Sequence, residues 1–303
     1  MNMRKMMIAI ILVAAVVTGA KAQILYRISG NGLDKPSYVI GTYHVAPVSF
    51  ADSIPGLKAA LAGTSQVYGE LEMKDFMNPD SVAMMQQAMM LGDGQKLTTL
   101  LDERQQAKLN AVLNKLIGAD LTSPMLKAQF DKIKPGALLM QLSMIMSVKL
   151  NPDFDATNPF DGYFQKVAQK DGKPVRGFET MGYQTDVLLK GVTMERQIEQ
   201  LMCFCDNYEY DEDFSKRMAR AFFSQDIEWI KKLFDERLGT SCDATDEEND
   251  RLIYNRNRNW LKVMPAIMKQ SPTFFAVGVG HIVGEKGILE ELRKAGYTVE
   301  GVK

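Results

Sequence analysis

The sequence predicts an α/β (α+β) protein whose central mixed β-sheet is built from N-terminal and C-terminal segments. Helices are expected to wrap this sheet, and the middle of the chain is expected to be largely helical. Short apolar and β-branched runs typical of strands occur at residues 23–30, 37–43, 66–73, 174–178, 273–280 and 297–302. Helical patterns fill most of the chain between residues 79 and 269. Such widely separated strands indicate a sheet assembled from distant segments rather than a simple doubly wound order.

The individual elements follow from local signals. Asn31-Gly32 predicts a hairpin turn between the first two strands, and residues 55–62 read as a short helix. Three helices are expected in the middle: one capped by Asp80 and running through Met90, one opened by Asp102 and one started by Pro135. Prolines, asparagines and aspartates make residues 151–160 a loop, and further helices are expected at 161–170, 184–269 and 285–295.

The first 22 residues read as a secretory signal peptide. Arg4 and Lys5 precede an apolar run, and Ala20-Lys21-Ala22 supplies a small-residue cleavage pattern. The apolar run is short for a bilayer span, which disfavours an uncleaved membrane anchor. We therefore expect an exported protein, periplasmic or secreted, with one domain over residues 23–303 and no stable membrane span.

Composition excludes some partners and leaves the cysteines open. The chain of 303 residues has a formal net charge of −1, which offers no electrostatic footprint for nucleic acid. In an oxidising compartment Cys242 could bond to Cys203 or to Cys205, with one thiol left over. Three unpaired core thiols are the equal alternative, and a four-cysteine zinc site is impossible.

The chain also has 20 methionines, several of them clustered. Examples are Met84, Met85, Met89 and Met90, and then Met140, Met144 and Met146. Clustered methionines could form a flexible peptide groove or a thioether copper site. Their helical spacing favours the simpler interpretation, which is burial in a helical core.

The strongest functional signal is a repeated pattern of an apolar strand, a glycine and a histidine. Tyr38 to Ile40 leads to Gly41 and His44, and Phe274 to Val277 leads to Gly278, Gly280 and His281. These are the only two histidines in the chain. Strand ends of α/β proteins face a crevice rather than the core, so both positions are candidates for chemistry.

Two histidines favour a metal site completed by a carboxylate. Glu70 directly follows the strand that ends at Gly69, and Glu72 is expected on the same face as a supporting residue or base. A divalent ion held by His44, Glu70 and His281 would activate water, so hydrolysis is the expected chemistry. A lone histidine beside a glycine is more often structural, but both histidines share this context.

Two further segments could complete the site. Gly177-Phe178-Glu179-Thr180 places an acid at a strand end, with Gln184 downstream. In a predicted helix, Arg256 could stabilise an oxyanion and Asn257 could orient a substrate carbonyl. A helix N-terminal carboxylate and a solvated helix face are the equally weighted structural alternatives. Tyr43 and Gln184 are the candidate substrate-binding residues.

The sequence gives little support for other known types of functional site. The glycines from Gly278 to Gly284 have the wrong spacing for a dinucleotide site, and the chain ends too soon afterwards. The sequence contains neither a Gly-x-Ser-x-Gly nucleophile elbow nor a His-Glu-x-x-His helix.

Together these motifs resemble the TraB/GumN family, which includes the pheromone-shutdown proteins and the Tiki proteases. The chain is more distantly similar to EreA-type erythromycin esterases and ChaN-like proteins. The matching segments are Gly41 to His44, Glu70-Leu71-Glu72, Gly177 to Thr180 with Gln184, Arg256-Asn257, and Gly278 to Gly284. Two departures are Glu72 where the family usually has aspartate and Phe178 where it has leucine. Arg258-Asn259 is a competing register for the arginine–asparagine pair.

The resemblance implies a mixed sheet wrapped by helices and a divalent metal, Mn or Co rather than Zn. It implies His44, Glu70 and His281 as the ligands. The leading hypothesis is an exported metal-dependent hydrolase that acts on a peptide or protein substrate. In it Glu72 or Glu179 takes a proton from water, and Arg256 or Asn257 stabilises the oxyanion.

Two alternatives belong to other classes, because family membership alone does not establish catalysis. The chain could be a non-catalytic protein that binds or sequesters a small peptide or a haem-like ligand. It could also be a structural or adaptor protein whose two histidines only pack.

Overall fold

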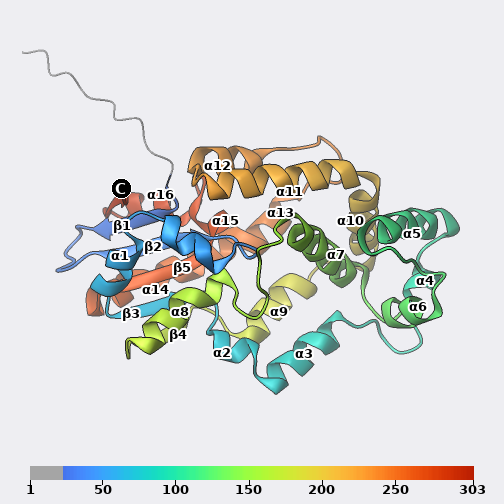
Figure 1. Ribbon diagram of the computed structural model, residues 1–303, viewed down its shortest axis with the longest axis horizontal. Coiled ribbons are helices and arrows are strands. Elements are labelled where there is room, and N and C mark those ends of the chain that lie inside the picture. The colour runs from blue at the N-terminus through green and yellow to red at the C-terminus, as the bar shows by residue number, and fades with distance from the viewer. Residues whose placement is uncertain (1–22) are drawn as a thin grey trace, which may run out of the picture.

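The computed structural model describes residues 23–303 and shows an elongated molecule with a sheet at one end and a helical region at the other (Figure 1). The expected signal peptide lies outside the described residues. The sheet has six strands: β1 (Leu25–Ser29), β2 (Ser37–Thr42), β3 (Gln66–Gly69), β4 (Val175–Gly177), β5 (Thr273–Gly278) and β6 (Thr298–Gly301).

The strand order β4-β3-β5-β2-β1-β6 confirms a mixed sheet built from both ends of the chain. The four strands β4, β3, β5 and β2 are parallel, and β1 pairs antiparallel with β2 and β6. The predicted hairpin therefore forms, with Leu25 opposite Ile40. Since all four parallel strands run the same way, their carboxyl ends share one edge of the sheet.

The connections are mostly helical. In chain order they are η1 (Val48–Ser53), α1 (Leu57–Gly63), α2 (Met73–Phe76), α3 (Pro79–Met89), α4 (Leu97–Leu100), α5 (Glu103–Ile117), α6 (Pro124–Phe130), α7 (Pro135–Leu150), α8 (Phe160–Lys170), α9 (Met181–Leu189), α10 (Met194–Asp206), α11 (Tyr208–Phe223), α12 (Ile227–Asp235), α13 (Asp246–Asn249), the π-helix η2 (Asp250–Tyr254), α14 (Asn255–Gln270), α15 (Val279–Ile282) and α16 (Ile288–Lys294). No helix within residues 23–303 is long and apolar enough to cross a membrane.

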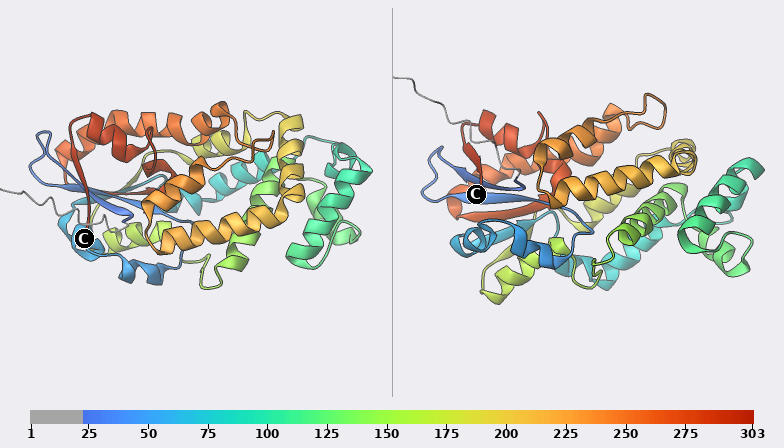
Figure 2. Two further views of the ribbon diagram at one scale, coloured as in Figure 1. Left: turned by 90° about the horizontal axis from the view of Figure 1, so that it is seen from above. Right: turned by 45° about the horizontal axis from the view of Figure 1, so that its top comes forward.

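Helices cover both faces of the sheet, with α1 and α8 on one side and α14 and α16 on the other (Figure 2). Side chains of β5 contact the helices on both faces of the sheet, because neighbouring residues on a strand point to opposite faces. Phe274 stacks on Phe164 of α8, with ring centroids 5.5 Å apart. Phe275 stacks on Phe178 at 5.6 Å, and Phe178 stacks in turn on Trp260 of α14 at 5.1 Å. Burial on both faces explains why this strand is apolar throughout.

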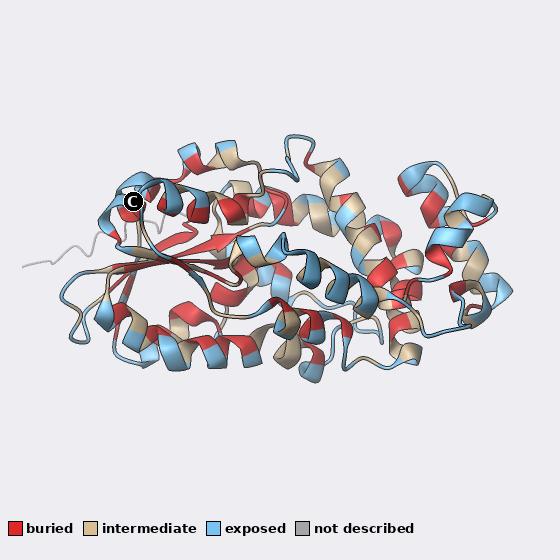
Figure 3. Ribbon diagram, turned by 90° about the horizontal axis from the view of Figure 1, so that it is seen from below, coloured by how far each residue is buried: buried red, intermediate tan, exposed pale blue. Residues whose placement is uncertain are grey.

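The helical region has a hydrophobic core of its own, and buried positions accordingly occur in both parts of the molecule (Figure 3). Leu109, Val112, Leu113 and Leu116 of α5 face this second core at helical spacing. The predicted start of α5 is confirmed, because Asp102 forms a capping box with Gln105. The helix ends at Gly118, which adopts the left-handed conformation. The single domain over residues 23–303 remains a prediction.

Several predicted elements need correction. Strand β3 ends at Gly69 instead of continuing to Met73, so Glu70 and Glu72 lie beyond it. Asn78, not Asp80, caps α3, because its side chain accepts from the backbone N–H groups of residues 80 and 81. The chain after Gly278 forms the short helix α15 rather than continuing as a strand.

The prediction that the methionine clusters lie in a helical core is wrong for most of them. Of the seven methionines named above, only Met146 is buried. Met84, Met90, Met140 and Met144 are exposed, with fractional exposures of 36–45%. Helical spacing shows which side chains share a face, but it does not show whether another element covers that face.

The structure decides between the two cysteine alternatives. Cys203 of α10 forms a disulfide with Cys242, which lies in the segment between α12 and α13. Cys205 stays a free thiol. The disulfide ties a loop of the helical region to α10.

Candidate active site at the carboxyl edge of the sheet

Four of the predicted residues follow four adjacent parallel strands. His44 comes after β2, Glu70 after β3, Glu179 after β4, and His281 lies in α15 after β5. The strand registers place Gly69 beside Gly177 and Ala276, and Thr42 beside Gly278. Strands β3 and β4 therefore end together, and β5 and β2 end together two residues further on. The sequence thus places four ionisable side chains at one edge of the sheet.

Glycine is required here by close packing rather than by turn geometry. A Cβ on Gly177 would lie 2.8 Å from the backbone nitrogen of Glu72. A Cβ on Gly41 would lie 2.7 Å from the Ile282 side chain and 3.0 Å from the Val279 backbone. Hence the strand-end glycines let the segments that carry Glu70 and His281 approach the sheet closely.

Arg256 of α14 lies at the centre of this edge. Its Nε and Nη2 donate to the two carboxylate oxygens of Glu179, at 2.9 and 2.8 Å. Its Nη2 also donates to Glu70, and its Nη1 lies 3.0 Å from Nε2 of His281. The guanidinium therefore joins residues from three of the four strand ends. Only 8% of the Arg256 side chain is exposed, so these are buried, charge-assisted hydrogen bonds.

The hydrogen bonds determine the state of His281. Arginine only donates, so Nε2 of His281 must accept from Arg256. Asn257 donates its amide to the carbonyls of His281 and Lys286, so its oxygen faces Nδ1 of His281, 2.7 Å away. His281 is therefore neutral, with its proton on Nδ1. Burial, opposed by the charge of Glu70, lowers the pKa of His281 to about 4, in agreement with this state.

Glu70 is held as a carboxylate. Burial by itself raises its pKa, but the charges of Arg256 and His44 and the hydrogen bond from the backbone N–H of Gly278 lower that pKa to about 2. The Gly278 N–H donates to Oε1 of Glu70 at 2.8 Å. With both glutamates ionised and His281 neutral, the cluster around Arg256 has one negative charge in excess, which favours a positively charged ligand.

His44 stands apart from this cluster. Its Nδ1 lies 2.9 Å from Oδ2 of Asp161, and the other oxygen of Asp161 accepts from the hydroxyl of Thr42. The charge of Asp161 and this hydrogen bond raise the pKa of His44 to about 9. The imidazole is 65% exposed, and within residues 23–303 it forms no hydrogen bond or ion pair with Glu70 or His281. Its Nε2 forms no hydrogen bond within residues 23–303, and with this pKa it carries a proton near neutral pH that it would have to lose to bind a metal ion.

The remaining predicted residues take different positions. Gln184 donates to Oε2 of Glu70 at 3.2 Å and so borders the cluster. The Glu72 carboxylate pairs with Lys74 at 2.6 Å, at the start of α2. The Tyr43 ring packs on Phe222, with centroids 5.4 Å apart, and burial raises the pKa of its hydroxyl.

The structure also decides the register of the arginine–asparagine pair. Arg256 and Asn257 are buried against the site, whereas Arg258 and Asn259 are exposed. Arg258 contacts Asn255 and Asp250, and Asn259 accepts from Lys262, all on the outer surface of the helix. An advance of two residues turns the side chain to the opposite face of a helix, which explains the difference.

Sequence reasoning missed two residues that contact the site. Asp161 bonds both Thr42 and His44, and the indole Nε1 of Trp260 donates to Glu179 at 2.9 Å. The Trp260 ring also packs on His281 with centroids 4.4 Å apart. Trp260 lies one helical turn after Arg256 on α14, which could have signalled it. Nothing local in the sequence links Asp161 to His44.

The donor types at this edge suit a divalent ion, but their arrangement is not that of a three-ligand site. Oε1 of Glu70 and Nε2 of His281 lie 3.8 Å apart, which brings two donors together. The Nε2 lone pair is already used by Arg256, and His44 is bound to Asp161. Within residues 23–303, no group of three or more His, Cys, Asp or Glu side chains is placed to hold a metal ion.

The fold and this edge define an α/β protein with a buried carboxylate–arginine–histidine cluster where parallel strands end. The TraB/PrgY/gumN family matches residues 24–301, and the chain belongs to that family. The family assignment made from the motifs is therefore confirmed.

Curated relatives of the chain are named metalloproteases. "Metalloprotease TIKI1" of Homo sapiens is 24% identical over 88% of this chain and 60% of its own length. "Metalloprotease TIKI1" of Danio rerio is 22% identical over 88% of this chain and 61% of its own length. "Metalloprotease TIKI2" of Danio rerio is 22% identical over 88% of this chain and 58% of its own length. The chain thus spans about 60% of the length of these relatives. No solved structure matches it.

Proposed function

We propose that this chain is an exported, metal-dependent hydrolase that cleaves peptide bonds. The cofactor is a divalent ion, Mn²⁺ or Co²⁺ rather than Zn²⁺, with His44, Glu70 and His281 as its ligands. The proposal is supported by the position of His44, Glu70, His281 and Arg256 at one edge of the sheet, and by relatives that are named metalloproteases.

A bound divalent ion supplies a Lewis acid that polarises a carbonyl and strengthens water as a nucleophile near neutral pH. The residues of the chain supply the rest. Arg256 stabilises negative charge on the substrate carbonyl oxygen, and Glu179 holds the guanidinium in place through two hydrogen bonds. Asn257 keeps the proton of His281 on Nδ1, so that Nε2 stays a lone-pair donor.

The remaining roles fall to residues at the rim of the cluster. Glu72 or Glu179 accepts the proton from water, and Glu72 must first exchange its pairing with Lys74. Tyr43 and Gln184 contact the substrate. Ion binding and the Arg256–His281 hydrogen bond exclude one another, because both need the lone pair of Nε2.

Export is part of the proposal. Residues 1–22 have the pattern of a signal peptide, and the Cys203–Cys242 disulfide suits an oxidising compartment such as a periplasm or the extracellular space. A cellular fractionation that found the mature chain only in the cytosol would contradict this part.

The test is a peptide-library assay on purified residues 23–303 with Mn²⁺ or Co²⁺, together with metal analysis of the protein. We expect cleavage by the wild type and none by His44→Ala. His44→Ala also removes the ion pair with Asp161, so a melting curve of the variant is recorded to separate loss of activity from unfolding. Equal cleavage by the variant and the wild type would remove His44 from the reaction.

The second candidate is a protein that binds a small peptide or a haem-like ligand without turnover. It is favoured by one observation: Arg256, Glu179 and His281 already satisfy one another's hydrogen bonds, as expected of a stable polar network. This candidate predicts saturable binding with the ligand recovered intact. Cleaved ligand in the mass spectrum would refute it.

A further inference from the structure

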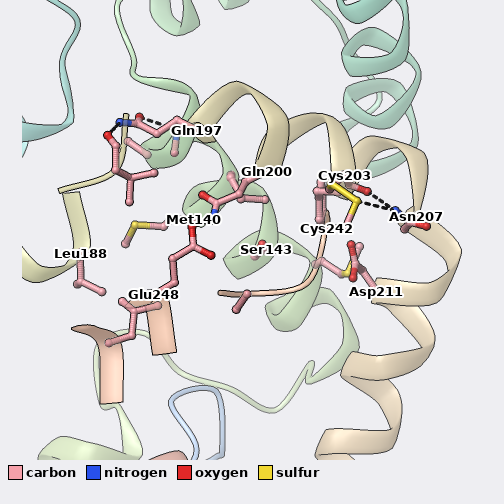
Figure 4. A pocket seen from close by; sticks show the side chains of 18 of the residues that line it. Met140, Ser143, Leu188, Gln197, Gln200, Cys203, Asn207, Asp211, Cys242 and Glu248 are labelled. Carbon is pink, nitrogen blue, oxygen red and sulfur yellow. Dashed lines mark hydrogen bonds between the residues drawn. A yellow bond between two sulfur atoms is a disulfide. The ribbon is translucent and has the colours of Figure 1, made fainter. Parts of the chain in front are cut away.

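The helical region contains a pocket that the site described above does not use. It has a volume of about 560 Å³ and lies between α7, α9, α10, α11 and residues 238–252 (Figure 4). Ligand pockets in proteins usually measure about 300–1,000 Å³, so this one is large enough for a ligand.

The pocket begins one helical turn from the candidate site. On α9, Gln184 bonds Glu70, and Leu188, four residues on, lines the pocket. Leu252 also lines the pocket, and its carbonyl accepts from Nη1 of Arg256 at 3.1 Å. Residues four apart in a helix lie on the same face, about 6 Å from each other. The pocket and the candidate site are therefore built on neighbouring turns of the same two helical segments.

The wall of the pocket is mostly apolar and partly adaptable. Its apolar side chains include Ala137, Met140, Phe204, Phe214 and Leu238. Met140 is exposed, and methionine adjusts its shape to different ligands. The Cys203–Cys242 disulfide forms part of the wall and ties the segment around Cys242 to α10. The wall thus suits an apolar ligand.

One carboxylate in this wall lacks a partner. Within residues 23–303, the side chain of Asp211 forms no hydrogen bond or ion pair, although Asp211 lines the pocket (Figure 4). Burial raises its pKa to about 6. The other acid of the pocket, Glu248, is bound by Arg196 and Gln200. Asp211 is partly buried, so a ligand that covered its carboxylate would also have to neutralise it, because an unpaired charge in an apolar wall is costly.

The helix position accounts for an acid at Asp211 but not for its lack of a counter-ion. The first turn of α11 favours acids through the helix dipole, and Glu209 of the same turn is an exposed acid paired with Lys115. Asp213, two residues further on, is likewise exposed and bonds Arg217. Asp211 alone among these three acids faces the pocket without a counter-ion.

The cations of the pocket lie at its other end. Arg251 donates to the carbonyls of Val187 and Lys190, beside Leu188, and Lys134 donates to the carbonyl of Ala88. Leu188 and Gln197, which mark this end, lie across the pocket from Asp211 (Figure 4). The pocket is thus polarised, with cations toward one end and a carboxylate at the other. A peptide with a basic group matches both ends of the pocket. Its carbonyl oxygens can accept hydrogen bonds at the end with Arg251 and Lys134, and its basic group can pair with Asp211 at the other end.

We propose that this pocket binds an apolar peptide segment that carries one basic group, with Asp211 as the counter-ion of that group. The claim that this peptide is the substrate rests on the proposed function, whereas the binding itself does not. A desolvated pair of opposite charges at this position supplies specificity for basic peptides.

The test uses three capped peptides, each with three leucines followed by lysine, norleucine or glutamate. Binding to residues 23–303 is measured by titration calorimetry in EDTA, so that metal-dependent cleavage does not interfere. We expect the lysine peptide to bind the wild type about 10-fold more tightly than the norleucine peptide, and the glutamate peptide most weakly. In Asp211→Asn, the preference for lysine over norleucine should fall to about 1.

Asp213→Asn is the matched control, because Asp213 lies on the same helix but faces solvent. It should keep the lysine preference. Ser143→Phe places a large ring in the pocket and should weaken all three peptides. Absence of binding in the wild type, or an unchanged lysine preference in Asp211→Asn, would overturn the proposal.

The pocket and the proposed function fail separately. Asp211-dependent binding without cleavage on adding Mn²⁺ would support the pocket and count against the hydrolase. Cleavage with no Asp211-dependent preference would support the hydrolase and refute the pocket.

Discussion

The most informative single substitution is Arg256→Met, which removes the charge at the centre of the site and keeps a long side chain. Arg256 makes two hydrogen bonds to Glu179, one to Glu70 and one to His281. Only 8% of its side chain is exposed to solvent. Without it, two carboxylates stay buried and uncompensated. Breaking a buried ion pair by removing one partner costs about 3–5 kcal/mol.

The loss depends on pH in a defined direction. The pKa of Glu70 is held at about 2, so its contribution to stability is present above its unfolded pKa of about 4.3 and is lost as the pH falls toward 2. Arg256→Met lacks one of the positive charges that lower the pKa of Glu70. Its stability deficit is therefore full near neutral pH and shrinks below about pH 4.

The assay is urea unfolding of residues 23–303, followed by circular dichroism near neutral and at acidic pH. Arg258→Met is the matched control, because Arg258 lies two residues away, is exposed and should change stability by less than about 0.5 kcal/mol. If Arg256→Met cost no more than Arg258→Met, the guanidinium would not be the counter-ion of the two buried carboxylates.

The same variant tests the competition between arginine and metal. Arg256→Met frees Nε2 of His281 and both carboxylates from their cation. Millimolar Mn²⁺ should then raise the Tm of this variant by more than it raises that of the wild type. An equal shift in both proteins would contradict the proposed exclusion of the ion by Arg256.

Two further predictions concern the helical region. Replacing Cys203 and Cys242 by serine should destabilise the protein by about 4 kcal/mol, because the bond closes a 39-residue separation; an unchanged Tm in the variant would refute this. Asp211→Asn should instead stabilise the protein by about 1–3 kcal/mol near pH 7.5, since the raised pKa of about 6 means that folding opposes ionisation of Asp211. The penalty is absent below the unfolded pKa of about 3.9 and grows as the pH rises to about 6, so the gain should vanish near pH 4 in urea melts. A gain of the same size at both pH values would show that it has another cause.

Much of the sheet could be predicted because strand signals are local. The apolar runs at 37–43 and 273–280 and the capped helix after Asp102 depend only on neighbouring residues. The methionine clusters show the limit of this reasoning. Spacing placed them on helix faces, but the absence of a covering element left most of them exposed.

For the candidate site as well, the sequence predicts the residue types but not the contacts between them. Its histidines and glutamates could be named in advance, because each follows an apolar strand and a glycine. The pairing of His44 with Asp161, residues 117 positions apart, depends on how α8 packs against the sheet. The choice of Arg256 over Arg258 likewise depends on which face of α14 meets that edge.

By itself the sequence determined the elements, the family and the set of ionisable residues, since these follow from short-range patterns of polarity and backbone preference. The tertiary structure alone decided that Arg256 lies among Glu70, Glu179 and His281, that His44 is held apart by Asp161, and that Asp211 faces a pocket without a partner. Charges and hydrogen bonds act between side chains that folding brings together, and their distances are not encoded in any single segment.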